Sequence, residues 1–168
     1  MRHFLLCSAL ALAAPTLAMA QPMTPPPAAQ YMTMAGQSDQ FEIDSGKLAR
    51  SKAMSPSLKT FGGKMVTDHT KSTQMVMAAA KKSGLPVGPP PALKPEQQAM
   101  LTELNGLNGA AFDKAYVTQQ LAAHKDALAL QSSYAKAGDD KNLKMTAGKI
   151  VPVVKMHLGM LQKMPGAM

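Results

Sequence analysis

Hydrophobic residues recur at alternating steps of three and four along most of the chain, with polar residues between them. This spacing places apolar side chains on one face of an α-helix and is typical of the core of a left-handed helical bundle. The pattern is strong in three segments and weaker in a fourth, which comes first in the sequence. The four stripes consist of Met34, Phe41 and Leu48; of Leu58, Phe61, Met65, Val76 and Ala80; of Val117, Leu121, Leu128 and Ala135; and of Leu143, Ala147, Ile150, Val154, Leu161 and Met164.

Proline and small polar residues mark the ends of these helices. Ser55 followed by Pro56 is typical of a helix start, with the serine as N-cap. Asp139 or Asp140 is expected to cap the last helix, and Pro152 is expected to kink or split it. The predicted long helices cover residues 28–53, 56–82, 110–137 and 140–164, and a short helix covers residues 95–107.

Proline-rich segments separate the helices from one another and from the N-terminus. Residues 85–95, LPVGPPPALKP, form a stiff connector that is long enough to cross the end of a bundle. Residues 21–27 contain four prolines and are expected to be an extended tail. The sequence therefore predicts an all-α fold, a four-helix bundle with a proline-rich crossover and one short extra helix, in a single domain over residues 28–165.

Residues 1–20 have the pattern of a cleaved signal peptide. Arg2 precedes an apolar run, and Ala18-Met19-Ala20 has the small-x-small form of a cleavage site. The run is too short to span a bilayer core of about 30 Å, and no later segment is apolar enough to do so. We expect an exported protein, periplasmic or secreted, whose mature form has lost the one cysteine, Cys7.

The charge of the mature chain suggests a class of partners. Removal of residues 1–20 leaves 17 Lys and Arg against 10 Asp and Glu, a net charge of +7. The lysines are spread over solvent-facing positions without interleaved aromatic residues, which does not favour nucleic acid as a partner. One hypothesis is therefore a basic adaptor for anionic envelope polymers, either glycans or lipid head groups.

Histidine is scarce, and its placement points to candidate chemistry. The chain has four histidines, and His3 lies in the predicted signal peptide, so the mature protein keeps His69, His124 and His157. Each of these falls between stripe residues of a different predicted helix. Glu42 borders the stripe of the first helix. All four positions lie near mid-helix, so their side chains are expected to meet in the middle of the bundle.

Two explanations of this cluster remain open. In the first, the histidines form a structural hydrogen-bond network, because buried polar groups need partners, inside a non-enzymatic binding or envelope-maintenance module. In the second, Glu42, His69, His124 and His157 form a mononuclear metal site, since imidazole and carboxylate are ligands of Zn, Fe and Mn. Imidazole nitrogens more than about 6 Å apart would exclude the second explanation, because metal–nitrogen bonds are about 2.1 Å long.

Methionine raises the question of Cu(I), which thioethers bind. Thirteen methionines remain after residues 1–20, and Met156, Met160 and Met164 form a row beside His157. We favour a packing role for them, because methionine fills gaps in a core that contains few aromatic residues.

Several enzyme classes lack their motifs in this chain. The di-iron bundle centre needs Glu-x-x-His twice, but the residues three positions before the histidines are Val66, Leu121 and Val154. The sequence also contains neither a Gly-x-Ser-x-Gly elbow nor a phosphate-binding glycine loop. We therefore expect a protein without catalytic activity.

Four segments resemble an exported bacterial family known as domain of unknown function 4142, whose members are often labelled outer-membrane proteins. The segments are QFEIDSGKLA, FGGKMVTDHTK, FDKAYVTQQLAAHKDAL and IVPVVKMHL, which begin at residues 40, 61, 112 and 150. They occur in the family's order and together span nearly all of the mature chain. The resemblance implies a ferritin-like bundle and a place in the cell envelope, and it implies no particular activity.

The same resemblance marks individual positions. It implies that Pro152 is shared by members of the family. It also implies an Asn shortly after the Asp-His-Thr run, which is replaced in this chain around Ser72 and Thr73. The family pattern includes Glu42, Asp68, His69, Asp113, Tyr116, His124 and His157. Asp68, Asp113 and Tyr116 are thus expected to support the candidate cluster.

Overall fold

The computed structural model describes residues 24–164, and all regular structure within them is α-helical. The predicted signal peptide lies outside the described residues. The helices are α1 (Ala28–Lys52), α2 (Pro56–Lys82), α3 (Pro95–Gly106), α4 (Gly109–Ala137) and α5 (Lys141–Leu161). Each agrees with a predicted helix to within three residues, so the all-α fold class is confirmed. None of these helices is long and apolar enough to cross a membrane.

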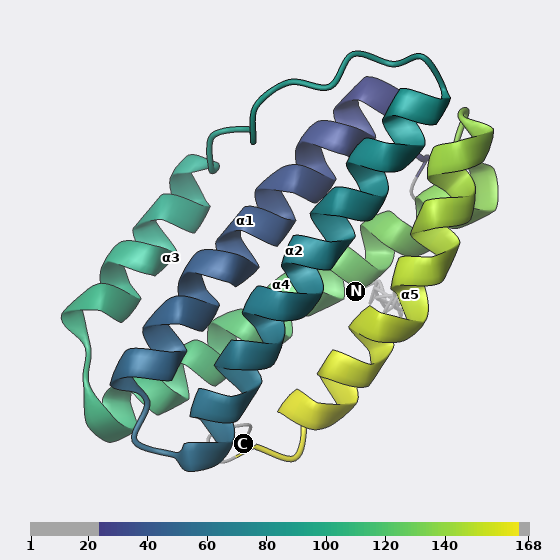
Figure 1. Cartoon of the computed structure of the whole chain (residues 1–168). Helices are drawn as coiled ribbons and strands as arrows, with labels where there is room; N and C mark the ends of the chain where they lie inside the picture. The colour runs from purple at the N-terminus through teal and green to yellow at the C-terminus, as the bar shows by residue number, and fades with distance from the viewer. Residues whose placement is uncertain (1–23, 165–168) are drawn as a thin grey trace, which may run out of the picture.

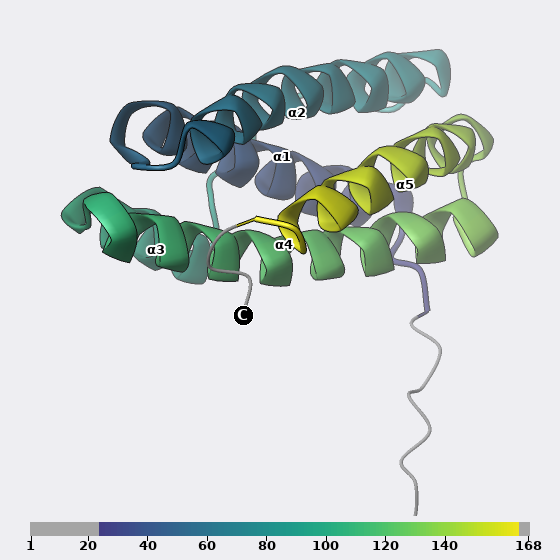
Figure 2. The ribbon, with the colours of Figure 1, turned by 90° about the horizontal axis from the view of Figure 1, so that it is seen from below.

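The long helices form two antiparallel hairpins that stack as two layers (Figures 1 and 2). One layer consists of α1 and α2, and the other of α4 and α5. The connector between α2 and α3 passes over one end of the bundle, and the short α3 then lies along α1 (Figure 1). The fold is therefore the predicted four-helix bundle with a proline-rich crossover and one short extra helix.

Helix ends follow the prediction, with one change in how they are capped. Asp140 caps α5, since its Oδ1 accepts a hydrogen bond from the backbone N–H of Leu143 at 2.8 Å. Ser55 occupies the N-cap position of α2, but its side chain makes no capping bond and pairs with Ser57 instead. The carboxylate of Asp113 in α4 accepts the backbone N–H groups of Met54 and Ser55, each at 2.9 Å. A tertiary contact therefore holds the turn that precedes α2, and the predicted local cap bond is not formed.

Pro152 does not split α5, which continues as one helix to Leu161. The proline cannot donate to the carbonyl of Gly148 one turn earlier. Both residues are exposed, so water can hydrate that carbonyl and the helix can tolerate the missing bond.

Two of the four predicted core stripes are offset from the buried face. The stripe residues of α2 are all buried, and those of α5 are buried except for Met164, which lies beyond its end. In α4, however, Leu121, Leu128 and Ala135 are only half-buried, because polar side chains take the deepest positions. In α1, Met34 and Leu48 are likewise half-buried. The buried polar or small residues that displace these stripes are Asp39, Glu42, Ser45, Gly46, Gln120, His124 and Gln131.

The apolar core is divided into two clusters. One cluster contains the stacked rings of Tyr31 and Tyr134, whose centroids are 3.8 Å apart. The other contains Phe61, Phe112 and Tyr116. Along each long helix, one or more buried polar residues lie between the segments that supply these two clusters. We call this set of Asp39, Glu42, His69, Gln120, His124 and His157 the polar layer.

The α1–α2 hairpin is closely packed at a pair of glycines. A Cβ atom added to Gly46 would lie 2.7 Å from the carbonyl oxygen of Gly62, and one added to Gly62 would lie 2.6 Å from that of Gly46. Such distances leave no room for a methyl group between two helix backbones. Both glycines are buried one to two turns from the polar layer.

We predict that Gly46→Ala or Gly62→Ala lowers the free energy of unfolding by about 1–3 kcal/mol, because the helices must separate to admit the methyl group. Gly63→Ala is the matched control, since its added Cβ would approach only Arg50 Cδ, at 3.9 Å. That control should be neutral or stabilising by up to about 1 kcal/mol through helix propensity. Chemical denaturation measures all three, and equal effects at positions 62 and 63 would contradict the close-packing argument.

Candidate metal centre

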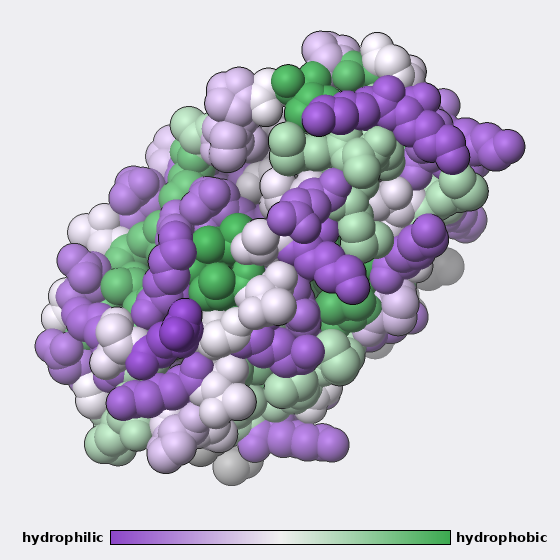
Figure 3. Space-filling model, in the orientation of Figure 1, coloured by the Kyte–Doolittle hydropathy of each residue, from purple (hydrophilic) through white to green (hydrophobic). Residues whose placement is uncertain are grey.

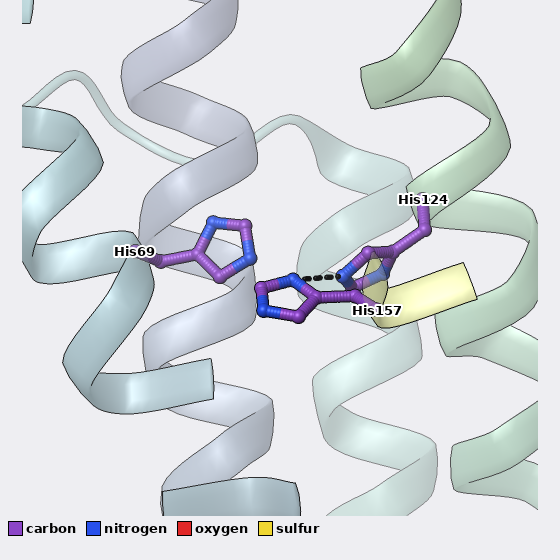
Figure 4. Close-up of side chains that lie close together, drawn as sticks. All are labelled: His69, His124 and His157. Atoms are coloured by element: carbon purple, nitrogen blue, oxygen red, sulfur yellow. Dashed lines mark hydrogen bonds between the residues drawn. The ribbon is translucent and has the colours of Figure 1, made fainter. Parts of the chain in front are cut away.

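Three histidines from three helices meet in the polar layer (Figure 4). His69 comes from α2, His124 from α4 and His157 from α5, and all three side chains are buried. One nitrogen of each ring lies within 4.8 Å of the corresponding nitrogen of the other two. His124 Nε2 and His157 Nδ1 are 3.3 Å apart. These distances fall below the limit of about 6 Å above which a shared metal ion is excluded.

The outward-facing nitrogen of His69 is held by a carboxylate. His69 Nδ1 lies 2.8 Å from Asp39 Oδ1, and the hydroxyl of Thr73 donates to Asp39 Oδ2 at 3.0 Å. A carboxylate can only accept here, so Nδ1 carries the ring proton. His69 Nε2 is buried and makes no hydrogen bond to a described residue.

The other two rings are fixed in the same manner. His157 Nε2 lies 2.8 Å from Asp68 Oδ2, which also pairs with Lys64 Nζ at 3.0 Å. His124 Nδ1 lies 3.0 Å from the backbone oxygen of Gln120. Because both partners are acceptors, the ring protons lie on His157 Nε2 and His124 Nδ1.

These contacts give each ring an outer nitrogen that donates and an inner nitrogen that carries a lone pair. The inner nitrogens are His69 Nε2, His124 Nε2 and His157 Nδ1. Metal-binding histidines usually show this arrangement, in which the second ring nitrogen donates to a carboxylate or carbonyl oxygen. The site can therefore bind a cation through up to three imidazole nitrogens without rearrangement of the outer bonds.

Electrostatics keep two of the rings neutral. Burial, together with the neighbouring His69 and His157, lowers the pKa of His124 to about 3. Burial lowers the pKa of His157 to about 4 against the opposing effect of its bond to Asp68. Burial also lowers the pKa of His69, but the bond to Asp39 and the nearby carboxylates outweigh burial, so its pKa is raised. Neutral imidazole is the form that binds metal.

Glu42 lies on the outer side of His124. Its Oε1 is 3.5 Å from His124 Nδ1, the nitrogen that bonds Gln120, and the carboxylate is not part of the group of three nitrogens. Burial raises the pKa of Glu42 to about 7, and its Oε2 has no hydrogen-bond partner among the described residues. The geometry thus separates Glu42 from the three inner nitrogens with which the sequence grouped it.

The supporting residues expected from the sequence divide in two. Asp68 contacts His157, as described, and Tyr116 is fully buried near Glu42, whose charge raises the pKa of the tyrosine. Burial is the larger cause of that shift. Asp113 does not join the polar layer, because both of its oxygens hold the turn between α1 and α2.

Several partners in the polar layer were not predicted from the sequence. Asp39 was overlooked although it lies three residues before Glu42, on the same face of α1. Gln120 lies four residues before His124, and its side chain donates to Ser45 Oγ at 3.1 Å. Thr73, in the Ser72–Thr73 region where the family resemblance leads us to expect an Asn, supplies the second bond to Asp39.

Two of the three methionines in the row beside His157 pack in the core. Met160 and Met164 lie against the apolar cluster around Phe61, as expected of methionine that fills gaps, whereas Met156 is 44% exposed.

Structural comparison finds similar helical bundles at low sequence identity. CopM in the Cu(II)-bound form is 16% identical, with a TM-score of 0.70 over 83% of this chain and 96% of CopM. CopM in the Cu(I)-bound form is also 16% identical, with a TM-score of 0.66 over 82% and 94% of the two chains. A DUF305 protein of Streptomyces coelicolor, named as a candidate secreted protein, is 12% identical, with a TM-score of 0.66 over 80% and 87%. At these identities, the likeness shows a shared fold.

Sequence comparison is more specific. None of the curated proteins compared with the chain matches it. A family model described as a domain of unknown function, DUF4142, matches residues 13–164. This range includes all of α1–α5 and every residue of the polar layer. The chain therefore belongs to the DUF4142 family.

Proposed function

We propose that the protein is an exported metal-binding protein and that His69 Nε2, His124 Nε2 and His157 Nδ1 bind one divalent transition-metal ion. The observation that supports this proposal is the orientation of the three rings. Each outer nitrogen donates to an oxygen acceptor, and the three inner nitrogens converge within 4.8 Å.

The spacing suits a tetrahedral ion. Two nitrogens bound to one such ion at about 2.1 Å lie roughly 3.4 Å apart, and His124 Nε2 and His157 Nδ1 are separated by 3.3 Å. His69 is the most exposed of the three at 5%, and a movement of up to about 1.4 Å would bring its Nε2 from within 4.8 Å to the same spacing. Three imidazoles leave a fourth coordination position open.

A purely structural network accounts less well for the inner side of the cluster. Each outer nitrogen already carries the single proton of a neutral ring, so His124 Nε2 and His157 Nδ1 face one another with two lone pairs. A hydrogen bond between them needs an additional proton, and burial opposes that proton by lowering the pKa of both rings. A bound cation removes this conflict.

The ligand set narrows the choice of metal. Neutral imidazole binds Zn, Cu, Fe and Ni, and divalent affinity is highest at Cu(II), with Zn(II) also strong. The copper-bound CopM structures share the fold and provide a reason to test copper alongside zinc. Binding through nitrogen alone disfavours Mg²⁺ and Ca²⁺, which prefer oxygen ligands.

We predict that metal-free protein without a histidine tag binds one Zn(II) or Cu(II) per chain in a calorimetric titration, and that Mg²⁺ does not bind. His69→Gln should weaken binding about 100-fold or more, beyond the usual effect of losing an outer-shell partner. At a free metal concentration 100 times Kd, the free energy of unfolding should rise by about 2.7 kcal/mol.

Gln131→Ala is the control for this titration. This variant removes the buried hydrogen bond of 2.8 Å that the hydroxyl of Tyr31 donates to Gln131, in an apolar cluster away from the histidines. It should therefore lower the free energy of unfolding without changing metal affinity. His69→Gln is the first variant to make, because His69 Nε2 has no hydrogen bond to lose. Equal affinities of the folded wild-type protein and the folded His69→Gln variant would refute the proposed site.

We predict that the metal-free protein loses stability through His124 as the pH falls below 6.5. In the unfolded chain His124 takes up a proton near pH 6.5, whereas burial keeps the folded ring neutral down to about pH 3. The unfolded state therefore binds more protons, and this one group lowers the free energy of unfolding by up to about 1.4 kcal/mol per pH unit.

Two neighbours oppose this trend, so the measurement needs a reference variant. The pKa values of His69 and Glu42 are raised in the folded state, so these two groups increase the free energy of unfolding as the pH falls. The stability of wild type minus that of His124→Gln, followed by denaturant unfolding from pH 6.5 downward, shows the contribution of His124. A difference that is constant with pH would contradict a neutral, buried His124.

A further inference from the structure

A cavity of about 410 Å³ lies under the proline-rich connector. Its walls come from the first half of α1, the second half of α2 and residues 85–91. Most of the lining is apolar, including Met32, Ile43, Met77 and Val87. Figure 3 looks onto this side of the molecule and shows hydrophobic surface between hydrophilic side chains. The volume falls in the range of about 300–1,000 Å³ that is typical of sites for small molecules.

The connector is held in place, so the cavity is formed in the free protein. Gln37 Nε2 donates to the backbone oxygen of Ala92 at 2.8 Å. Pro91 lies so close to α1 that a Cβ atom added to Gly36 would come within 2.9 Å of its ring. Proline fixes the backbone angle φ, which limits how far the roof of the cavity can move. A rigid cavity reduces the ordering cost of binding a ligand.

The charge of the cavity differs from that of the protein. The whole chain has 18 Lys and Arg and a net charge of +8, but neither residue type lines the cavity. Among the described residues 24–164, Asp39 is the one ionisable group that lines it. A ligand with a carboxylate or phosphate would therefore meet a carboxylate and no cation, whereas a ligand with a positive charge would find a complementary partner.

Asp39 has capacity for such a partner. A carboxylate offers about four acceptor positions, and the described contacts use two of them, one for His69 and one for Thr73. Asp39 is 4% exposed, so water competes weakly for the remaining positions. A protonated amine can donate to Asp39 while the rest of the ligand covers Met32 and Met77, whose flexible side chains adapt to its shape.

We propose that this cavity binds a small, mainly apolar molecule that carries a protonated amine, with the amine directed at Asp39. None of the three histidines lines the cavity, and the two sites share one residue, because Asp39 also bonds His69. Asp39 is the point where the cavity and the polar layer meet.

The test uses three probes of nearly equal shape on metal-free protein: 1-naphthylmethylamine, 1-naphthylmethanol and 1-naphthoate. Naphthalene fluorescence gives the affinities, and amide chemical shifts give the location. The amine should bind at least about 10-fold more tightly than the alcohol, because it adds a charge-assisted hydrogen bond, and naphthoate should not bind. Shifts should be largest for Met32, Met77 and Val87.

Variants distinguish this site from general hydrophobic binding. Asp39→Asn should reduce the affinity for the amine to that for the alcohol, while Asp44→Asn, a surface carboxylate paired with Lys47 outside the cavity, should leave it unchanged. Thr33→Trp places a large ring in the cavity from an exposed position and should abolish binding of both probes. Far-UV circular dichroism confirms that each variant is folded.

His69→Gln separates this inference from the proposed metal site. That variant should lose metal affinity and still bind the amine more tightly than the alcohol, since the Asp39 carboxylate and the apolar lining remain although the bond from His69 to Asp39 is lost. Equal binding of all three probes, or amine binding that Asp39→Asn and Thr33→Trp leave intact, would overturn the inference. Failure of the metal titration alone would leave the amine result unaffected.

Discussion

The rest of the structure depends on the need to satisfy a layer of polar side chains across the middle of an otherwise apolar bundle. A buried polar group without a partner costs roughly 1–3 kcal/mol, and the polar layer brings together three histidines, two carboxylates and a glutamine from four helices. Each imidazole meets its outer acceptor on α1, α2 or α4. All four long helices must therefore be positioned so that these side chains reach their partners in the polar layer. The two apolar clusters pack on either side of this layer.

Much of the fold could be predicted because proline and glycine act locally. Pro56 and Pro95 begin helices, and the prolines of the connector prevent one from forming, whatever lies nearby in space. The contact that holds the turn before α2 could not be predicted, since Asp113 reaches this turn from α4. The core face of α1 was misplaced because its buried positions hold Asp39, Glu42 and Ser45, which by themselves indicate a solvent-exposed surface.

The inward positions of the three histidines could be predicted from the sequence, whereas most of their hydrogen-bond partners could not. His69, His124 and His157 each interrupt an apolar stripe, and the helical period alone places them inward. Ring orientation depends instead on contacts between helices, such as those of Asp39 with His69 and Asp68 with His157. These contacts separate inner from outer nitrogens and leave Glu42 beside an outer one. The cavity under the connector could not be predicted from the sequence, because it forms only where residues 85–91 pass over α1 and α2.

The arrangement of two hairpins has a consequence for the order of folding. The contact of Asp39 with His69 lies within the α1–α2 hairpin, and that of His124 with His157 lies within the α4–α5 hairpin. Each contact can therefore form before the two hairpins pack against one another. The bond from His157 to Asp68 crosses between them, as does the approach of Glu42 to His124 at 3.5 Å. An ion held by all three imidazoles would join the two hairpins at the polar layer. It would therefore slow the separation of the hairpins from one another more than it slows the unfolding of either hairpin.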